Sequence, residues 1–395
     1  MSQITASVRF IGKQPIRLMA SLSAAFTSPI YGAYQNGDKN VGWVKLTVDG
    51  LAANTLYYVR PDFVGAVTAR LPVGTARTQP AGAHSFSFGA GSCWNPGRSW
   101  NNKFIATSIA NKVAANELQF FIHMGDIHYA DIQVDDVTLF RGEVDQVFLD
   151  PKRNTFMRSC PVYYMYDDHD AGGPDNGNRV DAGTAAGIEF IRKAAPNPAM
   201  AQASVSKSPY YSFIRGRCRF IVTDVRNDRD PITQMPASSR RVMQAEQTDW
   251  FYAQLTAANA ADQPVFWVST KPWHDASADS WGGYATHRTD IVDFITANGM
   301  TNKIAILSGD MHALAYDNGT NSPGGLRLLH CGPLDQSNSV KGGPYSHGPF
   351  TTNETQYGLI DVTDPGSGAV TVRFRGIACA SSSETVVIDQ TFSLG

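Results

Sequence analysis

The chain has few cysteines, and their spacing rules out two kinds of covalent scaffold. Its 395 residues include five cysteines, an odd and widely spaced set without a CxxC pair. Disulfide frameworks and structural zinc knuckles need paired or closely spaced cysteines, so the sequence predicts neither. We expect Cys160, Cys218, Cys331 and Cys379 to be small buried hydrophobic residues. Cys93 is the exception, because it lies at a glycine-turned strand end.

Long apolar runs, an export signal and an excess of charge are also missing. No stretch approaches the roughly 18 apolar residues of a membrane span, and the N-terminus lacks the apolar segment of a signal peptide. The net charge of −2 argues against non-specific binding of nucleic acids. As written, the sequence predicts a soluble cytoplasmic protein, or a periplasmic or secreted one whose signal has been removed. The oligomeric state stays open.

Three catalytic signatures are missing as well. The sequence contains no GxSxG, which argues against a serine hydrolase. It contains neither a P-loop nor a GxGxxG, so nucleotide-cofactor chemistry has no support.

The strand and helix patterns predict two domains. Residues 1–80 show short alternating runs separated by turn residues, including AVTARL at 66–71, which is typical of an all-β sandwich. The stretch VDGLAANTLYYVR resembles immunoglobulin or fibronectin type III domains, with Tyr57 or Tyr58 placed like a tyrosine corner. Residues 84–395 alternate between strand and helix patterns and end in an apparent hairpin. This second domain is predicted to be an α/β core whose sheet is covered by helices.

Polar residues directly follow five apolar strands of the second domain. The carboxyl ends of strands in an α/β sheet converge on the edge where ligands bind, so we expect these residues to meet. Carboxylates packed together raise one another's pKa, and a bound cation removes that difficulty. The five motifs are Gly91-Ser92-Cys93, Gly125-Asp126, Asp167-Asp168-His169-Asp170, Asp224-Val225-Arg226 and Gly309-Asp310-Met311-His312.

The run Asp167-Asp168-His169-Asp170 is the strongest indication of a metal site. Three carboxylates and an imidazole within four residues, directly after the apolar VYYMY, make a poor core and an unusual surface. Oxygen ligands together with a histidine suit divalent metals and phosphate chemistry. We therefore favour a metal site over a solvated acidic loop.

The other motif residues have ordinary alternatives when they are taken singly. Asp126 follows Gly125 and could cap the next helix. One turn of helix would aim Tyr129 at the same point, although a packed aromatic is the better interpretation without context. Asp310 and His312 can face one centre, or form a turn and a surface histidine.

Two arginines follow the strand CRFIVTDVR. A guanidinium group binds phosphate oxygens in a planar, bidentate manner, which makes Arg226 and Arg229 candidate phosphate contacts. The alternative is a salt bridge with Asp224 or Asp228, which we favour more for Arg229 than for Arg226.

Taken in order, the motifs resemble the PhoD-like alkaline phosphatase and phospholipase D family, within the metallophosphoesterase group. The resemblance runs the whole length and is carried by FGAGSC, HMGDIHYAD, DDHD, TDVRNDRD, AEQTDWFYAQL and LSGDMH. It implies a metallophosphoesterase fold and a metal-dependent phosphoesterase. It also implies a ferric ion bound through Cys93, Asp126, Tyr129 and Asp310, since thiolate and phenolate both favour iron(III).

A second metal centre is implied as well. It would typically hold calcium, with manganese, magnesium or zinc as alternatives, share Asp126, and use Asp167 or Asp168. The resemblance places His169, Arg226 and His312 in contact with the phosphoryl group or directly behind the metal ligands. We also expect His274 of VSTKPWHD to point inward, and Arg229 to contact substrate.

The expected reaction is metal-assisted hydrolysis of a small-molecule phosphate ester, a phosphodiester or a phosphomonoester. Two alternatives remain: phospholipase D activity on phospholipid head groups, and a non-catalytic binding module on the same fold. The segment Ser337–Phe350 is rich in glycine and proline, and we expect it to be a mobile loop that controls access.

Overall fold

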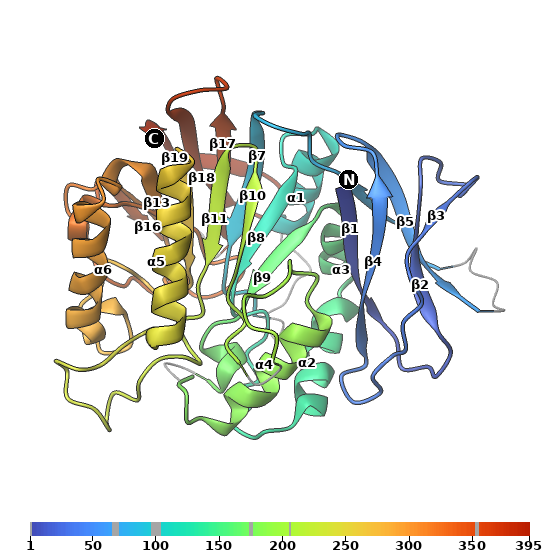
Figure 1. The fold of residues 1–395 in the computed structure, drawn as a ribbon, viewed down its shortest axis with the longest axis horizontal. Helices are drawn as coiled ribbons and strands as arrows, with labels where there is room; N and C mark the ends of the chain where they lie inside the picture. Colours follow the sequence, from blue (N-terminus) through green and yellow to red (C-terminus); the bar gives the residue numbers. More distant parts are fainter. Residues whose placement is uncertain (1, 65–70, 96–103, 174–176, 205–206, 352–354) are drawn as a thin grey trace.

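Two β-sheets form the centre of the second domain, with helices outside them and a separate β region at the N-terminus (Figure 1). The computed structural model describes residues 2–64, 71–95, 104–173, 177–204, 207–351 and 355–395. The strand expected over 66–71 falls almost entirely outside the described residues. The α/β character of this part is as predicted, but the strands divide between two sheets rather than forming one.

The first central sheet has six strands in the order β19-β18-β17-β7-β8-β9. Strands β7, β8 and β9 are parallel, and the other neighbours are antiparallel. The expected closing hairpin is β17-β18, and β19, which the sequence pattern missed, extends it. The strands are β7 (Phe86–Gly91), β8 (Phe120–Met124), β9 (Val162–Met165), β17 (Gln356–Thr363), β18 (Val370–Cys379) and β19 (Glu384–Leu394).

The second central sheet has seven strands in the order β10-β11-β12-β13-β15-β14-β16. Strands β11, β12, β13 and β15 are parallel, and the first three are joined through helices, as expected for strands that alternate with helices. The strands are β10 (Tyr211–Arg215), β11 (Cys218–Val222), β12 (Val265–Ser269), β13 (Ile304–Ser308), β14 (Leu314–Asp317), β15 (Arg327–His330) and β16 (His347–Phe350).

Helices cover the outer faces of both sheets. Phe251 of α5 and Ile291 of α6 share an apolar cluster with Trp267 of β12, whereas Ile105 of α1 and Phe156 of α3 pack with the six-stranded sheet. The helices are α1 (Ile105–Ala114), α2 (Val137–Leu149), α3 (Pro151–Ser159), α4 (Ala182–Ala194), α5 (Ala245–Ala260) and α6 (Ala285–Ala297). Short 3-10 turns are η2 (His169–Ala171), η3 (Trp281–Tyr284), η4 (Thr301–Lys303) and η5 (Pro323–Gly325).

Aromatic side chains fill the space between the two sheets. Strand β7 alternates, so Phe86 and Phe88 both face the other sheet. The Phe88 ring stacks on Phe120 at 5.1 Å and meets Phe220 and Phe266 edge-on, each at 5.3 Å. Because Phe220 and Phe266 belong to the seven-stranded sheet, this contact joins the two sheets at their centre.

The N-terminal region is all β, as predicted. Strands β1 (Ser2–Arg9) and β4 (Trp43–Leu51) form one sheet, and β3 (Ile30–Tyr31), β2 (Ile16–Ser21), β5 (Leu56–Phe63) and β6 (Gly74–Arg77) form another. Both sheets contribute to one apolar cluster. Buried Tyr57, rather than Tyr58, accepts a hydrogen bond from the Ala52 backbone N–H at 3.1 Å, as in a tyrosine corner. The boundary near residue 80 stays a prediction.

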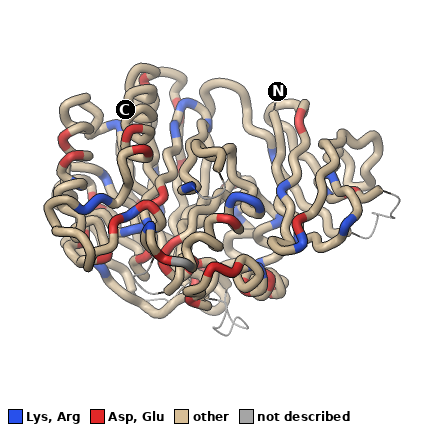
Figure 2. Tube along the Cα trace, turned by 60° about the horizontal axis from the view of Figure 1, so that its bottom comes forward, with Lys and Arg blue, Asp and Glu red and all other residues tan. Residues whose placement is uncertain are grey.

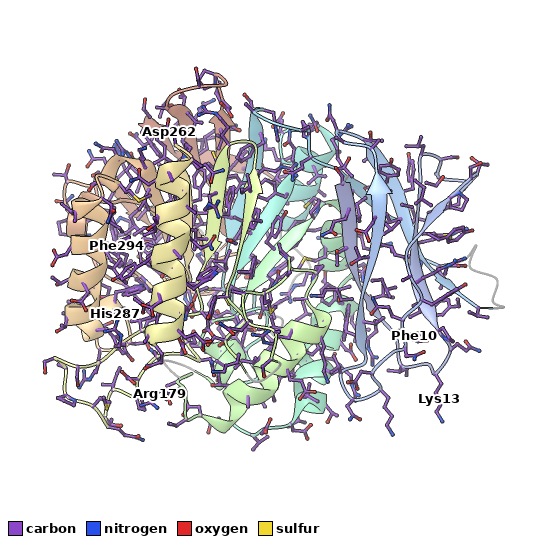
Figure 3. The ribbon with its side chains drawn as sticks, viewed as in Figure 1. Phe10, Lys13, Arg179, Asp262, His287 and Phe294 are labelled. Atoms are coloured by element: carbon purple, nitrogen blue, oxygen red, sulfur yellow. The ribbon has the colours of Figure 1, made fainter. Side chains whose placement is uncertain are left out.

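The N-terminal region packs directly on the loop and helices of the second domain. Trp43 lies in one apolar cluster with Ile127, Ile132 and Phe140. The indole N–H of Trp43 also donates to Asp145 on α2 at 3.0 Å. In Figure 3, Phe10 and Lys13 mark this side of the molecule, opposite His287 and Phe294 on α6.

Basic and acidic residues both occur along the whole length of the chain, and the cysteines form no pair. Lysine and arginine are interspersed with aspartate and glutamate along the trace (Figure 2). All five cysteines are free and buried. Among the described residues, no helix is long and apolar enough to cross a membrane.

The aromatic contact between the sheets predicts a large stability effect. Replacing fully buried Phe88 with alanine leaves a cavity between the sheets, so Phe88→Ala should lower the free energy of unfolding by about 3–5 kcal/mol in denaturant titration. The control is Leu149→Ala at the exposed end of α2, where we expect a change within about 0.5 kcal/mol. Equal effects of the two substitutions would contradict this account of the core.

Candidate metal centre

Three candidate ligands lie at equivalent places, two residues beyond the end of a parallel strand. Cys93 follows β7, Asp126 follows β8 and Asp310 follows β13. All three have left-handed backbones, with φ of +62°, +55° and +62°. Residues other than glycine rarely adopt this conformation, and such strain concentrates at functional sites.

Glycines let the strand-end turns approach one another closely. A Cβ at Gly125, where φ is +90°, would lie 2.3 Å from the Cβ of Asp167. A Cβ at Gly309 would lie 2.9 Å from the Cβ of Ser92. Gly309 follows a strand of one sheet and Ser92 a strand of the other, so the missing side chain is what allows the two sheets' turns to meet.

The turns bring sulfur, oxygen and nitrogen donors together. Cys93, Asp126 and His312 each offer one ligand atom, and these atoms lie within 4.8 Å of one another. Tyr129 joins them, since its hydroxyl donates to Asp126 Oδ2 at 3.2 Å. The expectation that a helical turn aims Tyr129 at the site was wrong, because this segment is a loop after the left-handed Asp126.

A second set of oxygen donors adjoins the first. Asp167, Asp168 and Asp310 form one such group, and Asp126, Asp168 and His169 form another, both within the same 4.8 Å limit. Asp126 and Asp168 therefore link the sulfur-containing group to the purely carboxylate group. This continuity is the arrangement expected of neighbouring cations that share a ligand.

Two of the carboxylates accept hydrogen bonds at only one of their two oxygens. Asp167 Oδ1 accepts from the Arg226 Nε–H and from the Thr270 hydroxyl, the latter at 2.9 Å. Asp310 Oδ1 accepts from Lys341 Nζ at 2.7 Å. The Oδ2 atoms of Asp167 and Asp310 are buried and accept no hydrogen bond among the described residues, and Arg226 Nη2 lies 3.6 Å from Asp310 Oδ2. Such orphaned anionic oxygens are costly unless a cation contacts them, so the residues present fit bound metal ions.

Burial and mutual repulsion both disfavour ionisation here. Burial raises the pKa of Asp126 well above its usual range, and the charges of Asp168 and Asp167 raise it further. Burial also raises the pKa of Asp167 to about 7, against the opposing charge of Arg226. Burial and the charge of Asp126 raise the pKa of the Cys93 thiol and the Tyr129 phenol. A metal ion would reverse each of these shifts.

Asp170 serves the backbone rather than the donor cluster. Its carboxylate accepts from the backbone N–H of Asp126 at 2.7 Å and of Ile127 at 2.9 Å, and from the Tyr164 hydroxyl at 2.8 Å. These bonds hold the turn after β8 against the turn after β9. The last carboxylate of the acidic run therefore fixes the conformation in which Asp126 projects.

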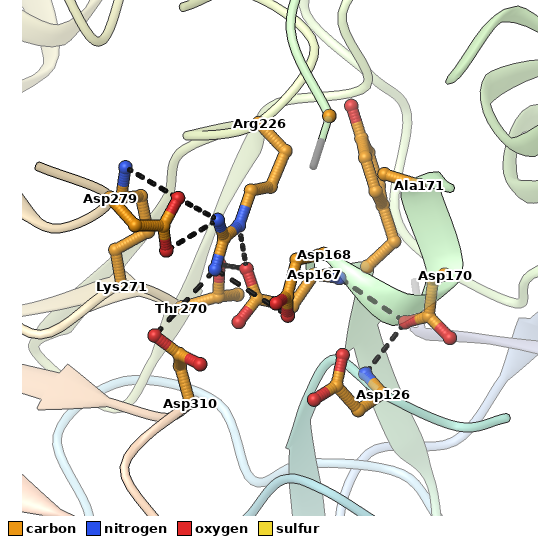
Figure 4. A network of polar contacts seen from close by, with 12 residues as sticks. Asp126, Asp167, Asp168, Asp170, Ala171, Arg226, Thr270, Lys271, Asp279 and Asp310 are labelled. Carbon is orange, nitrogen blue, oxygen red and sulfur yellow. Dashed lines mark hydrogen bonds and ion pairs between the residues drawn. The ribbon is translucent and has the colours of Figure 1, made fainter. Parts of the chain in front are cut away.

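Arg226 lies buried beside the carboxylates, held along two edges of its guanidinium group (Figure 4). Nε–H donates to Asp167, and Nη1 donates to both oxygens of Asp279 at 2.8 and 2.9 Å. Nη2 makes no hydrogen bond and lies 3.5 Å from Asp168 and 3.6 Å from Asp310. The guanidinium group is thus fixed with one nitrogen turned towards the donor cluster.

The alternative prediction for the two arginines, a salt bridge with Asp224 or Asp228, was wrong. Both Arg226 and Arg229 pair with Asp279, and Arg229 reaches it at 2.5 Å. Asp224 instead accepts from the Tyr166 hydroxyl at 2.9 Å and from the Arg226 backbone N–H at 3.0 Å. Arg229 lies behind Asp279, and its expected substrate contact stays a prediction.

Both candidate histidines are oriented through Nδ1. His312 Nδ1 donates to the Ser337 carbonyl at 2.7 Å, which leaves Nε2 as an acceptor. His169 Nδ1 lies 2.6 Å from Asp131 Oδ1. Such bonds orient imidazoles that bind metals or transfer protons. His274 is different: its ring lies 5.7 Å from Tyr345, and no hydrogen bond or ion pair seen among the described residues joins it to the cluster.

Sequence reasoning missed Asp279, Lys341, Thr270 and Asp131. Asp279 and Lys341 lie in loops without a strand-end pattern, so their positions carried no signal. Asp131, whose φ is +52°, stands two residues after Tyr129 in HMGDIHYAD and could have been found as part of that motif.

Comparisons with known proteins show which family and fold the chain is similar to. A family model described as PhoD-like phosphatase matches residues 88–324, more than half of the chain. Alkaline phosphatase D of Bacillus subtilis (strain 168) is 24% identical over 68% of this chain and 53% of its own length. The chain thus spans about half the length of this curated relative.

Two solved structures have a similar fold. One described as the structure of PhoD has a TM-score of 0.75 at 16% identity, covering 99% of this chain and 88% of that one. Purple acid phosphatase PPD1 from yellow lupin (Lupinus luteus) seeds has a TM-score of 0.65 at 12% identity, covering 100% and 72%. At these identities the likeness concerns the fold alone, and it confirms the predicted metallophosphoesterase-like architecture.

The buried contacts of Asp279 predict that losing this carboxylate destabilises the protein more than losing one partner of an exposed ion pair. Asp279→Ala removes the carboxylate that faces Arg226, Arg229 and, at 3.9 Å, Lys271 Nζ. Because these cations are buried, the free energy of unfolding should fall by about 3–5 kcal/mol in denaturant titration.

The matched control is the exposed Arg373–Asp389 pair, whose contact is 2.6 Å. Asp389→Ala should cost less than about 1 kcal/mol. A similar loss in both variants would show that burial does not set the strength of the Asp279 contacts.

Proposed function

Because the chain belongs to the PhoD-like phosphatase family, we propose that it hydrolyses phosphate esters with metal ions held at the strand-end cluster. The observation that supports this most directly is that two buried carboxylate oxygens, Asp167 Oδ2 and Asp310 Oδ2, accept no hydrogen bond among the described residues and lie beside a thiol and a phenol. A purely structural acidic cluster would be expected to satisfy its carboxylates with protein donors.

Two centres with different chemistry account for the donor set. Cys93, Asp126, Tyr129 and Asp310 would hold a ferric ion, since thiolate and phenolate stabilise iron(III). Asp126, with Asp167 or Asp168, would hold a second cation that prefers oxygen, such as Ca²⁺, with Mn²⁺, Mg²⁺ or Zn²⁺ as alternatives.

The chain's own side chains supply the remaining parts of the reaction. The bound cations would polarise the phosphoryl group and lower the pKa of an attacking water. Arg226 Nη2, fixed by the contacts of its two neighbouring nitrogens, would stabilise negative charge on the phosphoryl oxygens. His169 or His312, each with Nδ1 engaged, would donate a proton from Nε2 to the leaving oxygen when its ring is in the imidazolium form, and would then keep Nε2 as an acceptor. The substrate is therefore a small-molecule phosphomonoester or phosphodiester.

Replacing the proposed bridging carboxylate tests the function. Asp126→Asn replaces the charged carboxylate proposed for both centres with a neutral amide that offers one oxygen, so bound metal should fall in elemental analysis. Hydrolysis of p-nitrophenyl phosphate should drop at least about a hundredfold, since charge stabilisation at such sites is worth several kcal/mol.

The control is Asp249→Asn, an exposed position on α5. It should retain both metal content and activity. An Asp126→Asn protein with full metal content and full esterase activity would disprove the proposed site.

The iron assignment has a spectroscopic test. Phenolate- or thiolate-bound iron(III) absorbs visible light by charge transfer, so the native protein should be coloured. Tyr129→Phe should shift or remove the phenolate band, whereas Tyr58→Phe in the N-terminal β region should leave the spectrum unchanged. A colourless, iron-free and fully active protein would refute the assignment.

A further inference from the structure

The segment Ser337–Phe350 lies across the candidate metal centre and is anchored there. The His312 backbone N–H donates to the Ser339 carbonyl at 2.8 Å, and the Gly343 N–H donates to the His274 carbonyl at 3.1 Å. The segment ends in β16, which pairs with β14. It is therefore held on both sides of Lys341, and its predicted mobility stays a prediction.

Lys341 brings a cation from this segment into the carboxylate cluster. Its Nζ donates to Asp310 Oδ1 at 2.7 Å, while the Tyr345 hydroxyl donates to the Lys341 carbonyl at 2.5 Å. Asp310 Oδ2, the other oxygen of this carboxylate, accepts no hydrogen bond among the described residues and lies 3.6 Å from Arg226 Nη2. Lys341 and Arg226 therefore contact different oxygens of Asp310.

The two cations beside the cluster differ in what they can still bind. The Arg226 side chain is 0% exposed, with two of its three nitrogens engaged. The Lys341 side chain is 25% exposed, and among the described residues its ammonium group makes one hydrogen bond. An ammonium group has three donors on a flexible stem, so two remain for a molecule that arrives from solvent.

Phosphomonoesters and phosphodiesters would present different charges to the Lys341 ammonium group. Above a pH of about 6, a phosphomonoester carries two negative charges on three terminal oxygens. A phosphodiester carries one charge on two oxygens, because its second ester group replaces the third oxygen. An ammonium group at the edge of the site, on a side chain that is one quarter exposed, favours the ligand with the additional charged oxygen.

We propose that Lys341 contacts the third phosphoryl oxygen and makes the site selective for dianionic phosphomonoesters. This inference rests on the proposed function and assigns its substrate class. It gives Lys341 a role distinct from Arg226, which serves the oxygens that monoesters and diesters share.

The test compares the two ester classes in Lys341→Met and Lys341→Arg. For metal-loaded protein, Lys341→Met should lower kcat/KM for p-nitrophenyl phosphate by about tenfold or more, the value of one charged hydrogen bond. The effect on bis(p-nitrophenyl) phosphate should stay within about threefold, below the value of such a bond. Lys341→Arg should restore most of the monoester activity.

Binding of inorganic phosphate, measured by calorimetry, gives a readout that does not need turnover. Its dissociation constant should rise about tenfold in Lys341→Met, for the same reason. The matched control is Lys303→Met, which breaks the remote Lys303–Asp262 pair of equal length, 2.7 Å, and should change neither selectivity nor phosphate binding.

Three outcomes would overturn the inference. One is an unchanged ratio of monoester to diester activity in Lys341→Met, and another is unchanged phosphate affinity. The third is a loss of metal from both Lys341 variants in elemental analysis, because Lys341 would then act only by holding Asp310. If the native protein hydrolyses neither ester yet Lys341→Met still weakens phosphate binding, the proposed reaction fails while the phosphate contact stands.

Discussion

The repulsion among buried carboxylates is the constraint on which the rest of the site depends. Asp126, Asp167, Asp168 and Asp310 are all buried and lie close together, and three of them, Asp167, Asp168 and Asp310, face the guanidinium group of Arg226. Arg226 and Lys341 bring only two positive charges to these four carboxyl groups. Protein contacts fix one oxygen of Asp167 and one of Asp310, and their second oxygens have the chemistry that a cation requires.

The two-sheet core is what makes this convergence possible. Cys93 and Asp126 come from parallel strands of one sheet, and Asp310 comes from a parallel strand of the other. The aromatic layer around Phe88 holds the sheets together, and the small residues Gly125 and Gly309 let the turns approach. The left-handed backbones are the local cost of this arrangement, which the large apolar core offsets.

Sequence reasoning found the parts of the site that follow from local pattern. A strand followed by a polar turn is a local signal, and it located Cys93, Asp126 and Asp310 correctly at strand ends. How strands divide between sheets is a long-range property, so the two-sheet arrangement was not seen. The same limit applies to Asp279 and Lys341, because only tertiary structure brings these loop residues to Arg226 and Asp310. Tyr129 was placed at the right point through the wrong local geometry, since a loop rather than a helix carries it.

The packing of the N-terminal β region has a consequence for the metal centre. Ile127 and Ile132 flank the stretch that carries Tyr129 and Asp131, and both pack in one apolar cluster with Trp43. The loop with the phenol is thus pressed between the helices and a strand more than eighty residues away in sequence. The N-terminal β region covers the outer side of the loop that carries Tyr129, so the geometry of the candidate metal site depends in part on how this region packs against the rest of the chain.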